Sequence, residues 1–459
     1  MSVSLNPGIS GTKGLSTSGG ISLGTGVSRT GTSGVTDQSI AIWSPSVALS
    51  FIGVAKGVNK TKATWSANSN FPFVGLATTK APAKATWTAS ASLSVGGQSS
   101  AKSKATWSPA DTFSAIGAHT GGSVISNIQN ISITVAGAGS NTATITSVDT
   151  TKTIILMQGF TTPSISNSFY QGIIPRLSLT NATTVTATGG RSDATFTVNA
   201  VVITFASGVN SIQKGTISIA SGTSATATIS AVGANAFVIW LGSNVNGAGG
   251  SDPIFNAYTN VVLTNSTTVT ANISGIDSTV VVGYIVADLG STIVNTVQPV
   301  LHTTSGADTA NSETDTITSV TTGNTILVYN GASVGNSNPS NVIWDTTLTN
   351  ATTVTLTRGG TTGVATNTAY TVVQLAAGAL NGSVQRGAIT YSSAASGTST
   401  ISSVTTSKSF VNFTGFHTTG TTNPSICLSS LTLTNATTVT GNLNTSGTGA
   451  TQWEVVQFN

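Results

Sequence analysis

The sequence is dominated by one long unit that occurs four times in tandem. The string Leu-Thr-Asn-(Ala/Ser)-Thr-Thr-Val-Thr begins at Leu179, Leu263, Leu348 and Leu433, so the copies start at nearly equal intervals. Each copy is preceded, in the same order, by an apolar-Gln pair and by an Ile-x-(Ser/Ala)-Val element. The starts are 84, 85 and 85 residues apart. A unit of that length can enclose its own core, whereas a solenoid repeat is roughly 20–45 residues long and cannot. The repeat therefore predicts four similar domains in a row.

The composition of these units favours strands over helices. Thr and Val fit a pleated, half-buried surface, and Gly and Asn supply turns. Each unit shows five to seven short strand patterns with a turn signal roughly every 8–12 residues, which is typical of a sandwich or small barrel. We expect an all-β protein with four small antiparallel β-sandwich domains, immunoglobulin-like or lectin-like, arranged like beads. One continuous solenoid is the alternative. The predicted domains are 123–207, 208–291, 292–378 and 379–459.

The region before these domains carries a second, shorter repeat. Residues 1–40 form a Gly/Ser-rich arm, which we expect to attach the protein to a partner. The segment 41–122 contains four short repeats, each with one tryptophan: Trp43, Trp65, Trp87 and Trp107. Repeats this short cannot fold alone. They must stack on each other, form an intertwined stem, or lie along a partner.

The short repeats also predict a docking region. A lysine stands three positions before each of the last three tryptophans, at Lys62, Lys84 and Lys104. Residues 1–122 hold nine basic and two acidic side chains, a net charge of +7, whereas the rest of the chain carries −3. One interpretation places the tryptophans in a shared β core. The other makes them anchors in pockets of a partner, with the lysines contacting acidic groups.

The sequence offers little for catalysis. The three histidines, His119, His302 and His417, are isolated, and Cys427 is the only cysteine, so no zinc-ligand spacing exists. The carboxylates Glu313 and Asp315 occur in one repeat only. A Gly-x-Ser-x-Gly match at positions 20–24 lacks the strand and helix that a nucleophile elbow needs. We therefore expect no enzyme activity, no catalytic residues, no cofactor and no metal.

Other partner classes are also not expected. No apolar run is long enough to suggest a membrane span. The first residues lack the charged and apolar segments of a secretory signal, so we expect synthesis in a cytoplasm without a signal peptide. The positive charge of residues 1–122 is dilute and nearly free of arginine, so nucleic acid is not an expected partner.

Residues 123–459 repeat strings such as Ser211-Ile-Gln-Lys-Gly-Thr-Ile-Ser-Ile, Ala225-Thr-Ala-Thr-Ile-Ser-Ala-Val and the Leu-Thr-Asn motif. These repeats are similar to those of tailed-bacteriophage virion proteins. The third copy departs from the pattern with Val297-Gln-Pro, so its first strand is expected to be altered. The resemblance implies a structural component of a virion, such as a fibre, a collar or tail appendage, or a capsid decoration. Its partners would be other virion structural proteins.

Two further expectations follow. The alternative function is host attachment as a receptor-binding or carbohydrate-binding adhesin, with a host surface glycan as ligand. Trp240, Trp344 and Trp453 are candidates to stack on sugar, although each also fits a core position. A homo-oligomer is expected, with a trimer favoured, because thin fibres share cores between chains.

Overall fold

The computed structural model consists of two compact units, Met1–Gly122 and Ser123–Asn459. In unit 1 it describes the backbone of strands between Val3 and His119, but not their side chains. In unit 2 it describes all residues except 137–138, 163–173, 191–194, 246–255, 277, 307–308, 336–342, 361–364 and 420–427. Cys427 therefore lies outside the described residues.

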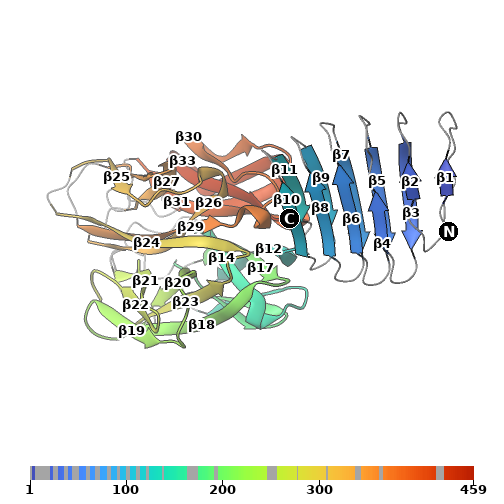
Figure 1. Ribbon diagram of the computed structural model, residues 1–459. Coiled ribbons are helices and arrows are strands. Elements are labelled where there is room, and N and C mark those ends of the chain that lie inside the picture. Colours follow the sequence, from blue (N-terminus) through green and yellow to red (C-terminus); the bar gives the residue numbers. More distant parts are fainter. Residues whose placement is uncertain are drawn as a thin grey trace. The chain divides into compact units, whose positions relative to one another are not determined.

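The strands of unit 1 form two parallel stacks (Figure 1). The first contains β4 (Ile40–Trp43), β6 (Lys62–Ala67), β8 (Lys84–Ala89) and β10 (Lys104–Pro109). The second contains β3 (Arg29–Val35), β5 (Phe51–Gly57), β7 (Phe73–Thr79), β9 (Ser94–Ser99) and β11 (Ser114–His119). β1 (Val3–Leu5) pairs with β2 (Ile21–Leu23). From β3 to β11, successive strands alternate between the stacks, so the short repeats stack on each other, one of the three predicted arrangements.

Unit 2 is all β, and each long repeat contributes an inner and an outer antiparallel sheet. In repeat 1 the inner sheet is β12 (Ile125–Ala136), β17 (Thr195–Phe205) and β14 (Thr153–Thr161), and the outer sheet is β13 (Ser140–Thr144), β16 (Thr184–Thr188) and β15 (Arg176–Asn181). The predicted fold class, all-β with tandem antiparallel β-sandwiches, is confirmed.

The other repeats follow the same strand order. Repeat 2 has β18 (Val209–Ile219), β23 (Val280–Leu289) and β20 (Ala236–Val245), with β19 (Ser224–Thr228), β22 (Thr268–Asn272) and β21 (Asn260–Asn265). Repeat 3 has β24 (Val294–Thr304), β29 (Thr366–Leu375) and β26 (Thr325–Val334), with β25 (Ser312–Thr316), β28 (Thr353–Thr357) and β27 (Asp345–Asn350). In repeat 4, the long strands β30 (Gln385–Thr400) and β33 (Thr438–Gln457) run through both sheets, which β31 (Ser409–Thr418) and β32 (Ser430–Asn435) complete.

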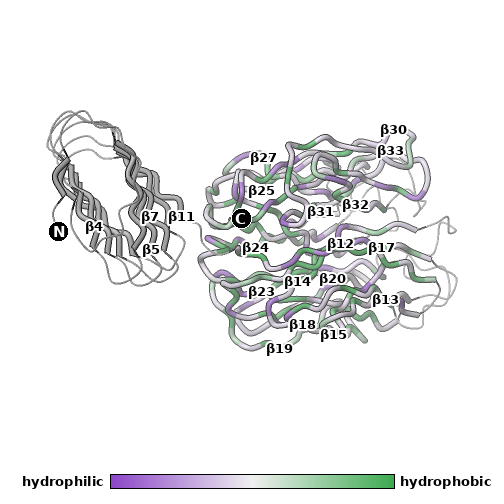
Figure 2. The backbone as a smooth tube through the Cα atoms, turned by 90° about the vertical axis from the view of Figure 1, so that its right-hand side faces the viewer, coloured by the Kyte–Doolittle hydropathy of each residue, from purple (hydrophilic) through white to green (hydrophobic). Residues whose placement is uncertain are grey.

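The four sandwiches close into a ring instead of following one another like separate beads. The third strands β14, β20, β26 and β31 contact each other in cyclic order, and β14 of repeat 1 also contacts β31 of repeat 4. The fourth strand of each repeat lies against the third strand of the next: β15 on β20, β21 on β26, β27 on β31, and β32 back on β14. One hydrophobic core runs through residues of all four repeats. Figure 2 shows that short hydrophobic and polar stretches alternate along these strands.

A glycine with positive φ makes each of these junctions possible. Gly159, Gly242, Gly331 and Gly415 have φ of 92°, 86°, 87° and 123°. Each lies at a bulge in a third strand, where the backbone of the neighbouring repeat approaches. A Cβ atom on Gly242 would lie 1.7 Å from the carbonyl oxygen of Pro175, so no larger residue fits. The glycine therefore allows the fourth strand of one repeat to join the sheet of the next.

The sequence landmarks of the long repeat correspond to two side-chain clamps. The amide of Gln213 accepts from Ser230 N at 2.7 Å and donates to Ser230 O at 2.8 Å, and Gln129, Gln298 and Gln385 make the same pair of bonds. In the Leu-Thr-Asn motif, the side-chain oxygen of Asn181 accepts from Thr183 N at 2.8 Å, and the other three copies repeat this turn. Both clamps satisfy backbone groups that the sheet ladders leave open.

The first strand of repeat 3 keeps its regular pairing despite Pro299. β24 pairs with β29 from Val294 to Thr304, and Pro299 lies opposite Thr371. β24 is the edge strand of its sheet, so the N–H that proline lacks is not needed for pairing on the open side. The expectation of an altered first strand in repeat 3 is therefore wrong: β24 pairs along its length, because an edge position tolerates the proline.

Candidate functional site

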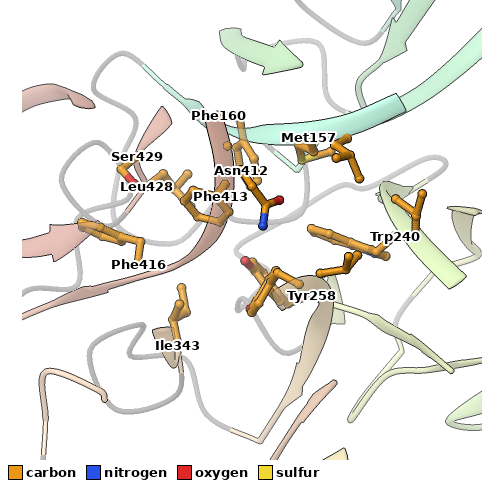
Figure 3. A pocket seen from close by; sticks show the side chains of 15 residues that line it. Met157, Phe160, Trp240, Tyr258, Ile343, Asn412, Phe413, Phe416, Leu428 and Ser429 are labelled. Carbon is orange, nitrogen blue, oxygen red and sulfur yellow. The ribbon is translucent and has the colours of Figure 1, made fainter. Parts of the chain in front are cut away.

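The centre of the ring of four sandwiches is filled by one side chain from each repeat. The residue two positions before each junction glycine is Met157, Trp240, Tyr329 or Phe413. The rings of Trp240 and Tyr329 lie 6.4 Å apart and those of Tyr329 and Phe413 6.1 Å apart, both edge to face. Figure 3 shows side chains of different repeats converging there. These contacts join the sandwiches through one apolar cluster.

The cavity that remains at this centre is small. Its volume is about 30 Å³, and its walls include Tyr258, Asn412 and Ser429 besides apolar side chains. That space holds about one or two water molecules and is too small for a sugar ring. Burial raises the pKa of Tyr258 to about 12, so its phenol is neutral and can donate a hydrogen bond at physiological pH. The ring centre is a packing element instead of a ligand site.

The three tryptophans considered as sugar platforms are core residues. Trp240, Trp344 and Trp453 are 4%, 0% and 4% exposed. The indole N–H of Trp240 donates to Thr259 Oγ1 at 3.1 Å, and that of Trp344 donates to Thr366 Oγ1 at 3.0 Å. An aromatic platform for sugar needs an exposed ring face, so these residues do not provide one.

Repeat 3 replaces part of its apolar core with ionisable groups. His302 stands where the other repeats have Ile133, Ile217 and Ile389. Its Nδ1 lies 3.1 Å from Asp315 Oδ1, and its Nε2 lies 3.1 Å from Glu313 Oε2. Both carboxylates belong to strand β25, whereas the calcium sites of EF-hands take their ligands from a loop.

The carboxylate of Asp315 is held by several neighbours. The hydroxyl of Tyr370 donates to Asp315 Oδ2 at 2.8 Å, and Arg358 lies over the Trp344 ring at 4.6 Å. Burial raises the pKa of Asp315, but hydrogen bonds from His302 and Tyr370 outweigh it and keep the pKa below its usual value. In the described part of the chain, no group of three or more His, Cys, Asp or Glu is arranged to hold a metal ion.

At two seams between repeats, a half-buried cation of one repeat binds a backbone carbonyl of the other. Lys214 of repeat 2 donates to the carbonyl oxygen of Thr150, and Arg386 of repeat 4 donates to that of Thr325. The carboxylate of Glu454 accepts from Arg386 Nε at 3.0 Å, from Leu327 N at 2.9 Å and from Asn412 Nδ2 at 3.0 Å. The Leu327 and Thr325 bonds cross from repeat 4 to repeat 3. Together these donors satisfy a glutamate that is 2% exposed.

The predicted docking residues of unit 1 lie in register. The Cα partners along the first stack are Trp43, Trp65, Trp87 and Trp107, strand by strand. Lys62, Lys84 and Lys104 are partners in the same way. Their side chains lie outside the described part of the structure, so the choice between core and anchor stays open for the tryptophans. The regular tryptophan spacing predicts one tryptophan per layer, and the parallel stacks place them in a column.

Sequence reasoning did not find the junction glycines or the His302 cluster. The glycines recur once per repeat at nearly equal intervals, but the chain has 50 glycines, which hides that pattern. His302 and its two carboxylates occur in one copy only, so the repeat pattern does not reveal them. An alignment of the four copies that included polar replacements at core positions would have found them.

No protein-family model matches the chain, and no curated protein is significantly similar to it. Among the residues that the structure describes, no helix has the length and apolar character to cross a membrane. Function is therefore inferred from the repeats and from the geometry above.

Proposed function

We propose that this chain is a non-enzymatic structural protein of a tailed-phage virion: a fibre, a collar or tail appendage, or a capsid decoration. It attaches through residues 1–122, and the repeated β-sandwiches project outward. The observation that carries the proposal is the closed ring of four sandwiches with a filled centre. Such a body is suited to persistence, because every sandwich is held by two neighbours and no disulfide is needed. The resemblance of the repeats to virion proteins supplies the context.

Removal of residues 1–122 tests the attachment role. Residues 123–459 form a compact unit of their own, so the shortened chain is expected to fold. We expect particles made with the shortened chain to lack it, whereas particles made with the full-length chain at the same expression level contain the protein. Quantitative mass spectrometry of purified particles measures both. Normal incorporation of the shortened chain would contradict the proposal.

The alternative function is host attachment through a surface glycan. The aromatic residues that first suggested it are buried, so it has lost its original support. A glycan array with the full-length chain tests it directly. Reproducible binding to one glycan class would favour the adhesin, and no binding would favour the structural role.

A trimer remains part of the proposal. It rests on unit 1, because thin stacked repeats can share their open faces between chains. The cores of unit 2 close within one chain and do not require it. Sedimentation equilibrium of the full-length chain, compared with residues 123–459, would measure the contribution of unit 1. A monomeric full-length chain would rule the trimer out.

A further inference from the structure

Unit 1 presents a column of lysines along one parallel sheet. Lys62, Lys84 and Lys104 are the first residues of β6, β8 and β10 and are direct partners in the ladder. Neighbouring strands of a sheet lie about 4.8 Å apart, so the column has one lysine at each step of that length. The lysine column, defined as these three residues, is thus a regular row of positive charge.

The tryptophans of the same strands belong to the opposite face of the sheet. In each strand the tryptophan follows the lysine by three positions, as Trp65 follows Lys62. Residues an odd number of positions apart in a strand belong to opposite faces. The lysine positions and the tryptophan positions therefore belong to opposite faces of the sheet.

No acidic residue nearby in the sequence can neutralise the lysine column. Between residues 38 and 110 the sequence has seven lysines and no acidic residue. Like charges directly opposite in neighbouring strands destabilise a sheet. Three successive strands keep a lysine at this position, so an anionic partner would relieve the repulsion between the lysines and stabilise the sheet.

The spacing and the residue type favour protein carboxylates as that partner. A column of Asp or Glu on another stack of strands repeats at the same distance of about 4.8 Å. The charges along one DNA strand repeat at about 3.4 Å and fall out of step with the lysines. Arginine, which matches phosphate with its planar fork, occurs once in residues 1–122, at Arg29.

We propose that the in-register column Lys62, Lys84 and Lys104 is the surface through which unit 1 binds an acidic protein partner, and that the tryptophan column on the opposite face is not part of that contact. This rests on the proposed attachment role of residues 1–122 and names its chemistry. The partner surface carries carboxylates that repeat at the strand spacing.

Binding of the full-length chain to immobilised poly-L-glutamate tests the proposal. K62Q/K84Q/K104Q removes the column, and K13Q/K152Q/K408Q is a control with the same loss of charge at other places. We expect the column variant to bind at least tenfold more weakly at physiological salt and the control to stay within twofold of wild type. The slope of log affinity against log salt is expected to fall by about 2 in the column variant only.

A charge-preserving variant and two other polyanions complete the experiment. K62R/K84R/K104R keeps the charge and is expected to bind like wild type, which separates loss of charge from loss of fold. Equal weakening of the column and control variants would overturn the proposal, as would tighter binding to double-stranded DNA or inorganic polyphosphate than to poly-L-glutamate at equal charge. Failure of the full-length chain to join particles, with binding to poly-L-glutamate intact, would refute the proposed function without refuting the column.

Discussion

Replacing a junction glycine by alanine should open the ring, and two glycines allow the effect to be measured against a control. Gly331 has φ of 87° and Gly382 has φ of 89°, so alanine strains both backbones alike, by about 1–2 kcal/mol. A Cβ on Gly331 would lie 2.1 Å from the carbonyl oxygen of Thr259, whereas nothing lies within 4 Å of one on Gly382. The fourth strand of repeat 2 must therefore move away in G331A, and overpacking of this kind costs about 1–3 kcal/mol more.

Urea unfolding of the full-length chain measures the difference. We expect G382A to lower the free energy of unfolding by about 1–2 kcal/mol and G331A by about 2–5 kcal/mol. Amide hydrogen exchange should also show faster exchange on both sides of the junction, in β21 and β26, in G331A alone. Equal destabilisation by the two substitutions, with no local change in exchange, would refute the role assigned to the junction glycines.

Three other substitutions probe the clamps and the buried ions. Q213M removes both bonds to Ser230 and should cost about 1 kcal/mol in urea unfolding, since water can replace them at this exposed site; an unchanged free energy of unfolding would mean that the clamp does not stabilise the repeat. E454Q leaves Arg386 without its charge partner at the repeat 3–4 seam and should cost about 3 kcal/mol, and an unchanged urea midpoint would contradict this. Asp315 has a lowered pKa in the folded protein, so it adds stability above its unfolded value of 3.8 and loses that contribution as pH falls through the folded pKa. D315N should therefore be less stable than wild type at pH 6, and the gap should shrink toward pH 2; a gap that does not vary with pH would argue against stabilisation of the Asp315 carboxylate by His302 and Tyr370.

The fold class could be predicted because local patterns determine it. The Leu-Thr-Asn turn and the apolar-Gln pair recur since each clamps its own repeat, and both therefore show in the sequence. Strand alternation and the turn spacing then indicate antiparallel sandwiches. All of these contacts join residues within one copy of the repeat.

The ring could not be predicted in the same way, because its contacts join different copies. The need for glycine at Gly242 comes from the backbone of Pro175, which belongs to the preceding repeat. His302 looked isolated for a different reason: its carboxylate partners belong to the same repeat but to a strand of another sheet, and no other copy repeats the three residues. Trp344 fitted a core position better than a sugar platform, but composition alone does not show which face of a strand is covered, so both interpretations remained until the structure showed it buried.

The closed ring also changes how unit 2 would respond to force. Ser123 Oγ lies 2.9 Å from the backbone oxygen of Asn459, so the first and last residues of the unit lie side by side. Sandwiches strung in a line would each carry the full tension between these two points and would unravel one at a time. In the ring, tension between residues 123 and 459 acts first on the seam between the first and fourth repeats. The strength of that one seam therefore sets the force at which the unit begins to open, and the other three seams are loaded only afterwards.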